Sequence, residues 1–369
     1  MNVLHIINTI DVGGAERLLI DTLPIMKAKG ISVRVLLLVA SGSAFEKQLG
    51  ADGIEVMSVD MRFGMFDPRL MFRLRGLMRG ADIVHTHLFP SQYWAALANR
   101  IGGRGVIITT EHSTSNTRAQ HWLTSKLDTC IYGLYDGVIC ISEAVADFMR
   151  KRTPRHVEIR CIENGVVLPS ADTLVVANRA EVVEGLADAD FVMLQVARFS
   201  DQKNQDCVIR SLKHLPDNVH VVFAGYGVRL DACRQLADSL GVSARTHFLG
   251  MRSDIARLWS IADIGVMSSH WEGFGLAAVE GMAYAKPVVA SDVPGLADVV
   301  RFGELLFAPD DDQALADSVM HLYADRAECR RLGELCKQRA QQYDIKNMVD
   351  SYIGFYSELL AKRTKERKR

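Results

Sequence analysis

The chain has 369 residues, 49% of them hydrophobic and 24% charged, with a formal net charge of −1. This length and composition predict two folded domains, each large enough to bury its own core. Apolar runs long enough to span a membrane are absent from the sequence, and we expect no signal peptide, because the first residues lead directly into a predicted strand. The seven cysteines show no metal-ligand spacing, so we expect reduced cysteines and a cytoplasmic protein.

Short β-branched runs alternate with longer helical patterns in both halves of the chain, which predicts two doubly wound, Rossmann-like α/β domains facing a cleft. We expect the first domain over residues 1–165 and the second over 166–345, with the break between residues 164 and 172. Residues 346–369 are expected to form a helix that returns to the first domain, followed by a basic tail. The expected strands are residues 3–7, 33–39, 83–87, 106–110 and 138–141, then 191–197, 220–224, 246–249, 264–267 and 287–290.

Each predicted domain begins with a strand, a loop of the kind that binds ligands, and a helix. In the first domain this loop contains Gly13 and Gly14, and in the second it contains Arg198 and Lys203. Ligands of open α/β sheets lie at the carboxyl ends of strands, so both loops are expected at a shared cleft. The glycines are weak evidence for phosphate binding because a tight turn needs them regardless, and the same holds for Gly225.

Residues 68–79 predict a short helix with Pro68 at its first position. An ordinary helix facing the core explains its pattern, and the alternative is an interfacial patch that collects anionic lipid or a lipid-diphosphate acceptor. One face holds the apolar side chains and four arginines flank it: Leu70, Met71, Leu74, Leu77 and Met78, with Arg69, Arg73, Arg75 and Arg79.

Basic residues are concentrated in the first 165 residues and the last 24, which together hold seven more basic than acidic residues. Residues 166–345 hold eight more acidic than basic ones. Scatter on a solvated surface is one explanation, but the basic tail at residues 362–369 favours a peripheral protein on the cytoplasmic leaflet of a membrane. Nucleic acid is not expected as a partner, because the basic clusters lack interleaved aromatic residues and a recognised module.

Three histidines lie at the ends of predicted strands. His85 and His87 alternate along one strand, and a His-x-His pair can bind zinc. A third ligand at a recognisable spacing is missing, so structural hydrogen bonding is the preferred interpretation and we expect no metal site. His112 follows the next strand, where it could bind a sugar hydroxyl, although a lone histidine is more often structural.

Arg198 and Lys203 follow the first strand of the second domain, five residues apart. Such a cation pair can neutralise a diphosphate without a metal ion, through the fork geometry of arginine and the point charge of lysine. A surface ion pair is the structural alternative.

Residues 271–280, with the sequence WEGFGLAAVE, form the most informative segment of the chain. Its glycines let a ligand approach the backbone, and a helix that begins near Leu276 or Ala277 offers its first N–H groups to an anion. Glu272 beside this phosphate site suggests a sugar joined to a diphosphate. Glu280 lies about one turn into the helix, where it could accept hydrogen bonds from ribose hydroxyls or act as a capping carboxylate.

On these segments the chain resembles the retaining family-four glycosyltransferases with the GT-B fold, which include bacterial enzymes that build surface polysaccharides and lipid-linked glycans. The resemblance covers nearly the whole chain, and the Glu-x7-Glu segment is its most specific element. The chain departs from the family in Ala197, Tyr226 and Asp298, where glycine, an acidic residue and glutamate are common. The other matching segments are residues 13–16, 82–87, 111–113, 164–166, 198–203, 248–250 and 286–291.

The resemblance implies a role for each candidate residue. The donor diphosphate would be held by Arg198 and Lys203, the ribose by Glu280, and the donor sugar by Glu272 with His112 near its outer hydroxyls. The remaining contacts would be the backbone of Phe274 and Gly275 with the sugar, backbone N–H groups of Gly13, Gly14, Leu276 and Ala277 with phosphate, and Gly225, Met251 and Arg252 near the nucleotide.

The implied reaction transfers a hexose or N-acetylhexosamine, with retention, from a nucleotide diphosphate sugar to a saccharide or lipid-linked saccharide. A UDP-sugar is the favoured donor and GDP-mannose is second. The leaving diphosphate would take the acceptor's proton, so neither a separate base nor a metal cofactor is expected. The alternatives are a nucleotide-sugar epimerase of the same fold and a non-catalytic subunit that binds nucleotide sugars.

Overall fold

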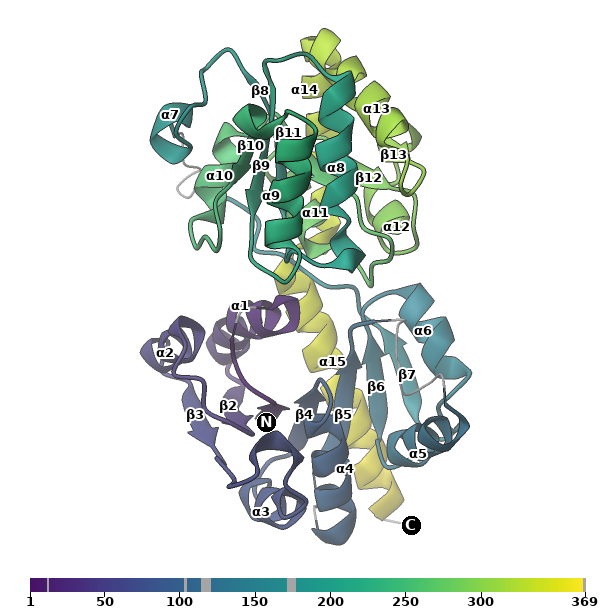
Figure 1. The fold of residues 1–369 in the computed structure, drawn as a ribbon. Coiled ribbons are helices and arrows are strands. Elements are labelled where there is room, and N and C mark those ends of the chain that lie inside the picture. Colours follow the sequence, from purple (N-terminus) through teal and green to yellow (C-terminus); the bar gives the residue numbers. More distant parts are fainter. Residues whose placement is uncertain (12, 103–104, 114–120, 171–176, 368–369) are drawn as a thin grey trace. The chain divides into compact units, whose positions relative to one another are not determined.

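Two parallel β-sheets, one in each of two compact units, organise the computed structural model of the protein (Figure 1). The structure describes residues 1–11, 13–102, 105–113, 121–170 and 177–367. Unit 1 comprises Met1–Gly165 and Ile345–Arg369, and unit 2 comprises Val166–Asp344. The predicted pair of doubly wound α/β folds is confirmed, since helices alternate with parallel strands in both units.

Unit 1 contains a seven-stranded sheet in the order β3-β2-β1-β4-β5-β6-β7. The order reverses between β1 and β4, and crevices beside such a switch point are the usual ligand sites of open α/β sheets. The strands are β1 (Asn2–Ile7), β2 (Ser32–Leu37), β3 (Glu55–Ser58), β4 (Ile83–His87), β5 (Val106–Glu111), β6 (Gly137–Cys140) and β7 (Glu158–Cys161). The helices are α1 (Gly14–Ala28), α2 (Ala44–Ala51), α3 (Leu70–Leu77), α4 (Ser91–Gly102), α5 (Trp122–Tyr132), α6 (Glu143–Arg150) and α15 (Ile345–Arg367).

Unit 2 contains a six-stranded sheet in the order β10-β9-β8-β11-β12-β13. Its order reverses between β8 and β11, which places the loops after these two strands at the second switch point. The strands are β8 (Phe191–Val196), β9 (Val219–Ala224), β10 (Thr246–Phe248), β11 (Ile264–Met267), β12 (Val288–Ser291) and β13 (Leu306–Phe307). The helices are α7 (Arg179–Val182), α8 (Gln205–Ser211), α9 (Leu230–Ser239), α10 (Ile255–Ile261), α11 (Leu276–Ala283), α12 (Leu296–Val300), α13 (Asp312–Ala324) and α14 (Arg326–Ala340).

The sequence pattern found the central strands but missed β3, β7 and β13. All three lie at a sheet edge, where a strand is covered less completely than at the centre. Every residue of β3 and β7 is exposed or only partly buried. The continuous apolar run that reveals a buried parallel strand is therefore absent from them.

The C-terminal helix α15 packs within unit 1, as the sequence predicted. Phe355 and Tyr356 are buried, and the Tyr356 hydroxyl lies 2.6 Å from Nδ1 of His85 on β4. The helix continues through most of the predicted basic tail to Arg367, and Lys362 there pairs with Glu158 at 2.7 Å. Most of the predicted basic tail is thus helical, and its residues 368–369 lie outside the described part of the chain.

The helix expected over residues 68–79 is shorter than predicted. It begins at Leu70, and Pro68 lies in the turn before it rather than at its first position. Leu70, Leu74 and Met78 are buried while Arg73 is exposed, so α3 uses its apolar face in the core of unit 1. The ordinary core-facing interpretation therefore accounts for most of this helix.

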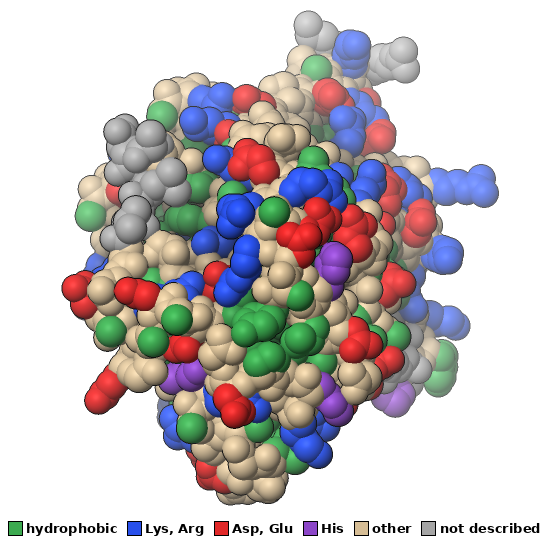
Figure 2. All heavy atoms as spheres, turned by 90° about the horizontal axis from the view of Figure 1, so that it is seen from above, with side chains coloured by type: hydrophobic (Ala, Val, Ile, Leu, Met, Phe, Trp, Pro, Cys, Tyr) green, Lys and Arg blue, Asp and Glu red, His purple; other side chains and the backbone are tan. Residues whose placement is uncertain are grey.

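The surface of the described residues shows mixed charge. On the face drawn in Figure 2, basic and acidic side chains are interspersed around a small group of hydrophobic ones. Among the described helices, none is both long and apolar enough to cross a lipid bilayer. All seven cysteines are free, and five of them are buried, as expected for reduced core cysteines.

Candidate functional site

The loop after β8 carries the two predicted cations. Residues Asp201–Lys203 form a short 3-10 turn that leads into α8, and Asn204 caps this helix with a φ of 47°. The ammonium of Lys203 forms an ion pair with Glu272 from the loop after β11. The guanidinium of Arg198 is exposed and makes no ion pair with any described residue, so its charge is available to a ligand.

Buried hydrogen bonds fix the Lys203 loop to the end of β11. Ser268 donates to the carbonyl oxygens of Lys203 and Asn204 at 2.9 and 2.8 Å, and Gln195 on β8 donates to the Lys203 carbonyl at 3.2 Å. Ser268 and Gln195 are buried. Sequence reasoning missed these supporting residues, although polar side chains inside apolar strands are a signal that could have found them.

Glu272 is held in place by contacts with Lys203 and with Ser269 of its own loop. Its carboxylate accepts a hydrogen bond from Ser269 at 3.3 Å in addition to the Lys203 ion pair. The side chains of Lys203 and Glu272 are 23% and 15% exposed, so the pair is partly desolvated yet open to a ligand. The structure therefore brings together two of the four residues predicted to be catalytic.

The helix α11 begins at Leu276, which confirms the predicted start. Gly275 precedes it with a φ of 97°, and a Cβ atom there would lie 2.6 Å from Leu296 of α12, so both the backbone and the space require glycine. The first N–H groups of a helix, here those of Leu276 and Ala277, have no partner within the helix and attract anions. Phe274 is buried against Tyr343, which anchors the turn.

Glu280 lies on α11 and is partly buried. Burial raises the pKa of Tyr284, one turn later on the same helix, and the negative charge of Glu280 raises it further. The carboxylate of Glu280 thus lies close to the Tyr284 side chain.

The loops after β9 and β10, which were predicted to lie near the nucleotide, adopt tight conformations. Gly225 has a φ of 150°, and a Cβ atom there would lie 1.9 Å from the carbonyl oxygen of Ala197, so close packing of two loops explains this glycine. Met251 is 62% exposed. Arg252 forms a two-point ion pair with Asp254, at 2.7 and 2.6 Å, which holds its guanidinium beside its own loop.

Gly13, Gly14 and His112 belong to unit 1. Gly13 precedes α1 in an extended conformation that any residue can adopt, and Gly14 is the first residue of that helix. His112 follows β5, and burial lowers its pKa to about 4. Although the residue is partly exposed, its Nε2 atom is buried and has no hydrogen-bond partner among the described residues.

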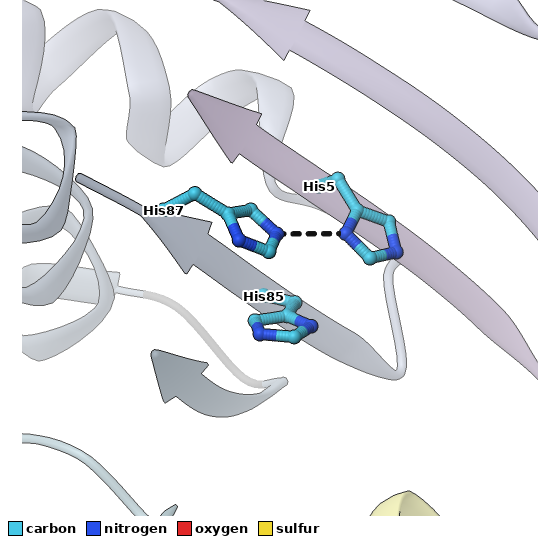
Figure 3. A group of neighbouring side chains, drawn as sticks. All are labelled: His5, His85 and His87. Atoms are coloured by element: carbon cyan, nitrogen blue, oxygen red, sulfur yellow. Dashed lines mark hydrogen bonds between the residues drawn. The ribbon is translucent and has the colours of Figure 1, made fainter. Parts of the chain in front are cut away.

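His85 and His87 form hydrogen bonds, as the preferred interpretation expected, and a third histidine lies beside them. His5 on β1 is paired with His85 in the sheet register, and the three side chains point toward one another (Figure 3). The sequence concealed this residue, since β1 and β4 are neighbours in the sheet but 80 residues apart in the chain.

Two family models match the chain. The one described as Glycosyltransferase Family 4 covers residues 12–168, and the one described as Glycosyl transferases group 1 covers residues 178–339. Together they account for most of the sequence and coincide closely with the two units.

Individual proteins are similar over most of their length. The putative glycosyltransferase EpsD of Bacillus subtilis is 29% identical over 334 residues, covering 85% of this chain and 87% of the relative. The N-acetyl-alpha-D-glucosaminyl L-malate synthase of Bacillus anthracis is 25% identical over 293 residues, covering 76% of this chain and 75% of the relative. The crystal structure of HepE from Anabaena in complex with UDP-glucose superimposes with a TM-score of 0.84 at 22% identity, covering 97% of this chain and 100% of that chain, and shares its fold.

Proposed function

Because the chain belongs to the family-four glycosyltransferases with the GT-B fold, we propose that it is a retaining enzyme that uses a nucleotide diphosphate sugar. The transferred group is a hexose or N-acetylhexosamine, and the acceptor is a saccharide or lipid-linked saccharide of a bacterial glycan. The observation that carries this proposal is the Lys203–Glu272 ion pair beside the start of α11, with Arg198 on the same loop as Lys203.

Each part of this site has a counterpart in the donor. A diphosphate carries negative charge for Arg198, Lys203 and the N–H groups at the start of α11, while sugar hydroxyls suit the carboxylate of Glu272. In the free protein Lys203 and Glu272 neutralise each other. A bound donor would draw Lys203 to its phosphates and leave Glu272 to accept from the sugar.

The chemistry then depends on charge stabilisation. As the glycosidic bond loosens, negative charge grows on the leaving diphosphate, and fixed cations and helix N–H groups stabilise it without reorganisation. The leaving phosphate takes the proton of the acceptor hydroxyl, which requires no separate base. We propose that these protein groups suffice without a metal cofactor.

A UDP-sugar is the proposed donor, with GDP-mannose second. HepE, which shares the fold, is described in complexes with UDP and with UDP-glucose, and the Bacillus anthracis relative is named for an N-acetylglucosaminyl product. These descriptions support a uridine nucleotide with a hexose or N-acetylhexosamine. The alternative is a subunit that binds nucleotide sugars without catalysing transfer. The site does not favour it, because all four candidate side chains are present: Arg198, Lys203, Glu272 and Glu280.

A donor screen by thermal shift tests the proposed site. A ligand present at about 100 times its Kd stabilises the folded state by roughly 2.7 kcal/mol, which corresponds to a rise in Tm of about 5–10 °C for a domain of the size of unit 2. We expect such a rise with a UDP-sugar, a smaller one with GDP-mannose, and none with either donor for Lys203→Ala. A wild-type protein whose Tm responds to no nucleotide sugar would refute the assignment.

Analysis of the products separates the three candidate functions: transferase, epimerase and binding subunit. An epimerase converts the donor sugar in the absence of any acceptor, a transferase forms a glycoside only when an acceptor is present, and a binding subunit leaves the donor intact. NMR of donor incubated with and without a mixture of saccharide acceptors distinguishes these outcomes.

We also propose a cytoplasmic location, with peripheral binding to the inner leaflet through the surface around α3. Arg73 and Arg79 are exposed there, and Phe63, Phe66 and Phe72 are 67%, 62% and 61% exposed. Basic and aromatic side chains together suit the interface of an anionic membrane.

Flotation with anionic liposomes tests this surface. We expect binding at low salt that weakens at high salt, and a large loss of binding for the triple variant Phe72→Ser/Arg73→Ala/Arg79→Ala. The matched control Arg330→Ala, an exposed arginine of α14, should bind as the wild type does. Absence of binding at low salt would remove the membrane proposal.

A further inference from the structure

Three histidines occupy one face of the sheet in unit 1. His5 on β1 is directly opposite His85 on β4 in the parallel register, and His87 follows two residues later on the same strand, so its side chain returns to the same face. Figure 3 shows the three imidazoles gathered between these strands. The topology thus creates a three-histidine cluster from residues that lie far apart in the sequence.

The spacing of the cluster is close to that of a metal site. One nitrogen from each ring lies within 4.8 Å of the others. Nδ1 of His5 and Nε2 of His87 share a hydrogen bond of 3.1 Å, which shows how closely the two rings approach. Ligands about 2.0–2.1 Å from a tetrahedral zinc ion are separated by roughly 3.3 Å. Small rotations of rings that already approach one another would therefore complete the coordination.

The cluster is buried inside unit 1. His5 and His85 are fully buried and His87 is 3% exposed, so bulk solvent does not reach the nitrogens that would bind a metal ion.

One nitrogen of the cluster is unpaired. Nε2 of His5 is buried and has no hydrogen-bond partner in the described part of the chain. Buried polar atoms in native proteins are nearly always paired, so this nitrogen is a candidate ligand atom of His5.

The neighbours of His85 resemble the outer shell of a metal centre. Its nitrogens lie 2.6 Å from the Tyr356 hydroxyl and 2.7 Å from Thr110 Oγ1. If one nitrogen binds a metal, the other keeps its hydroxyl partner, and such a bond orients the ring of a metal-bound histidine.

We propose that His5, His85 and His87 bind one transition-metal ion, with Zn2+ as the expected ion, and that this ion fastens β1 to β4. An all-imidazole site suits zinc and related transition metals rather than Mg2+ or Ca2+, which prefer oxygen ligands. The fourth position is open to a water molecule. The site belongs to unit 1, whereas Arg198, Lys203 and Glu272 belong to unit 2, so the proposal stands independently of the donor assignment.

Metal analysis of the purified full chain tests the proposal. Protein produced in zinc-supplemented cells and dialysed without chelator should retain about one zinc per chain, and the double variant His5→Gln/His87→Gln should retain almost none. The matched control is His220→Gln/His247→Gln, which removes a histidine pair of unit 2 that lies 3.0 Å apart, and it should retain the wild-type zinc content.

Spectroscopy on the wild-type chain covers the case in which the double variant does not fold. Chelator-treated protein given Co2+ should develop the intense visible bands of a four-coordinate site, and X-ray absorption of the zinc form should show three imidazole ligands. Wild-type protein that retains less than about 0.1 zinc per chain and takes up no Co2+ would overturn the proposal. A zinc content unchanged in the folded double variant would overturn it as well.

Discussion

Lys203 connects the two loops that form the candidate site. Its ion pair with Glu272 joins two loops that the sequence placed 69 residues apart, and the resemblance gave those residues separate roles without predicting their contact. Gln195 and Ser268, which support the loop from behind, were invisible to motif reasoning because their importance comes from hydrogen bonds to backbone atoms. The resemblance thus named the candidate residues, while the hydrogen bonds that position Lys203 became visible only in the structure.

Two histidines of unit 2, His220 and His247, are expected to make the stability of the fold depend on pH. Nδ1 of His220 lies 3.0 Å from Nε2 of His247, so one ring must donate and the other must accept. Burial lowers the pKa of both histidines, while the nearby Asp190 opposes that shift. Because the unfolded chain then binds protons at a higher pH than the folded one, acidification below about pH 6.5 destabilises the fold.

We therefore expect the Tm of wild-type protein to fall between pH 7.5 and pH 5.5, and to fall less in His247→Gln. The exposed His321→Gln serves as the matched control and should show the wild-type decrease. Differential scanning fluorimetry at both pH values measures the difference. An equal decrease in wild type and His247→Gln would contradict the role of the pair.

Among the elements, the parallel strands at the centre of each sheet were predictable because burial on both faces leaves a continuous apolar run in the sequence. The edge strands were not, since β13 has only two residues and β3 is largely exposed. Helix ends were harder to predict: α3 begins two residues later than Pro68 suggested, and α15 continues to Arg367, through the predicted basic tail.

The turn before α11 yields a prediction at the element scale. Gly275→Ala places a side chain at a φ of 97° and within 2.6 Å of Leu296, so we expect a loss of roughly 2–4 kcal/mol in the free energy of unfolding and weaker donor binding. Gly241→Ala is the matched control, because it shares a positive φ but meets no atom within 4 Å, and it should cost about 1 kcal/mol. Urea unfolding measures both, and equal losses would show that the contact with Leu296 is unimportant.

At the scale of the whole molecule, alternation of strands and helices predicted two similar α/β units, and the structure has them. The three-histidine cluster could not be predicted from the sequence, because only the order of strands in the sheet places His5 beside His85. The fold also neutralises part of the positive charge of the C-terminal tail. Lys362 and Arg363 form ion pairs with Glu158 and Asp136 within unit 1. The exposed surface around α3 is therefore a better candidate for a membrane contact than the tail.

We propose that Arg198 and Lys203 stabilise the diphosphate that leaves during a retaining sugar transfer. NMR of the anomeric signal during turnover of the best UDP-sugar, with wild type, Lys203→Ala and Arg198→Ala, tests this role. We predict a glycoside with the donor's anomeric configuration from the wild type, and rates roughly 10²–10³-fold lower from each folded variant. An inverted product would rule out retention, and variants that work at the wild-type rate would rule out the role of the two cations.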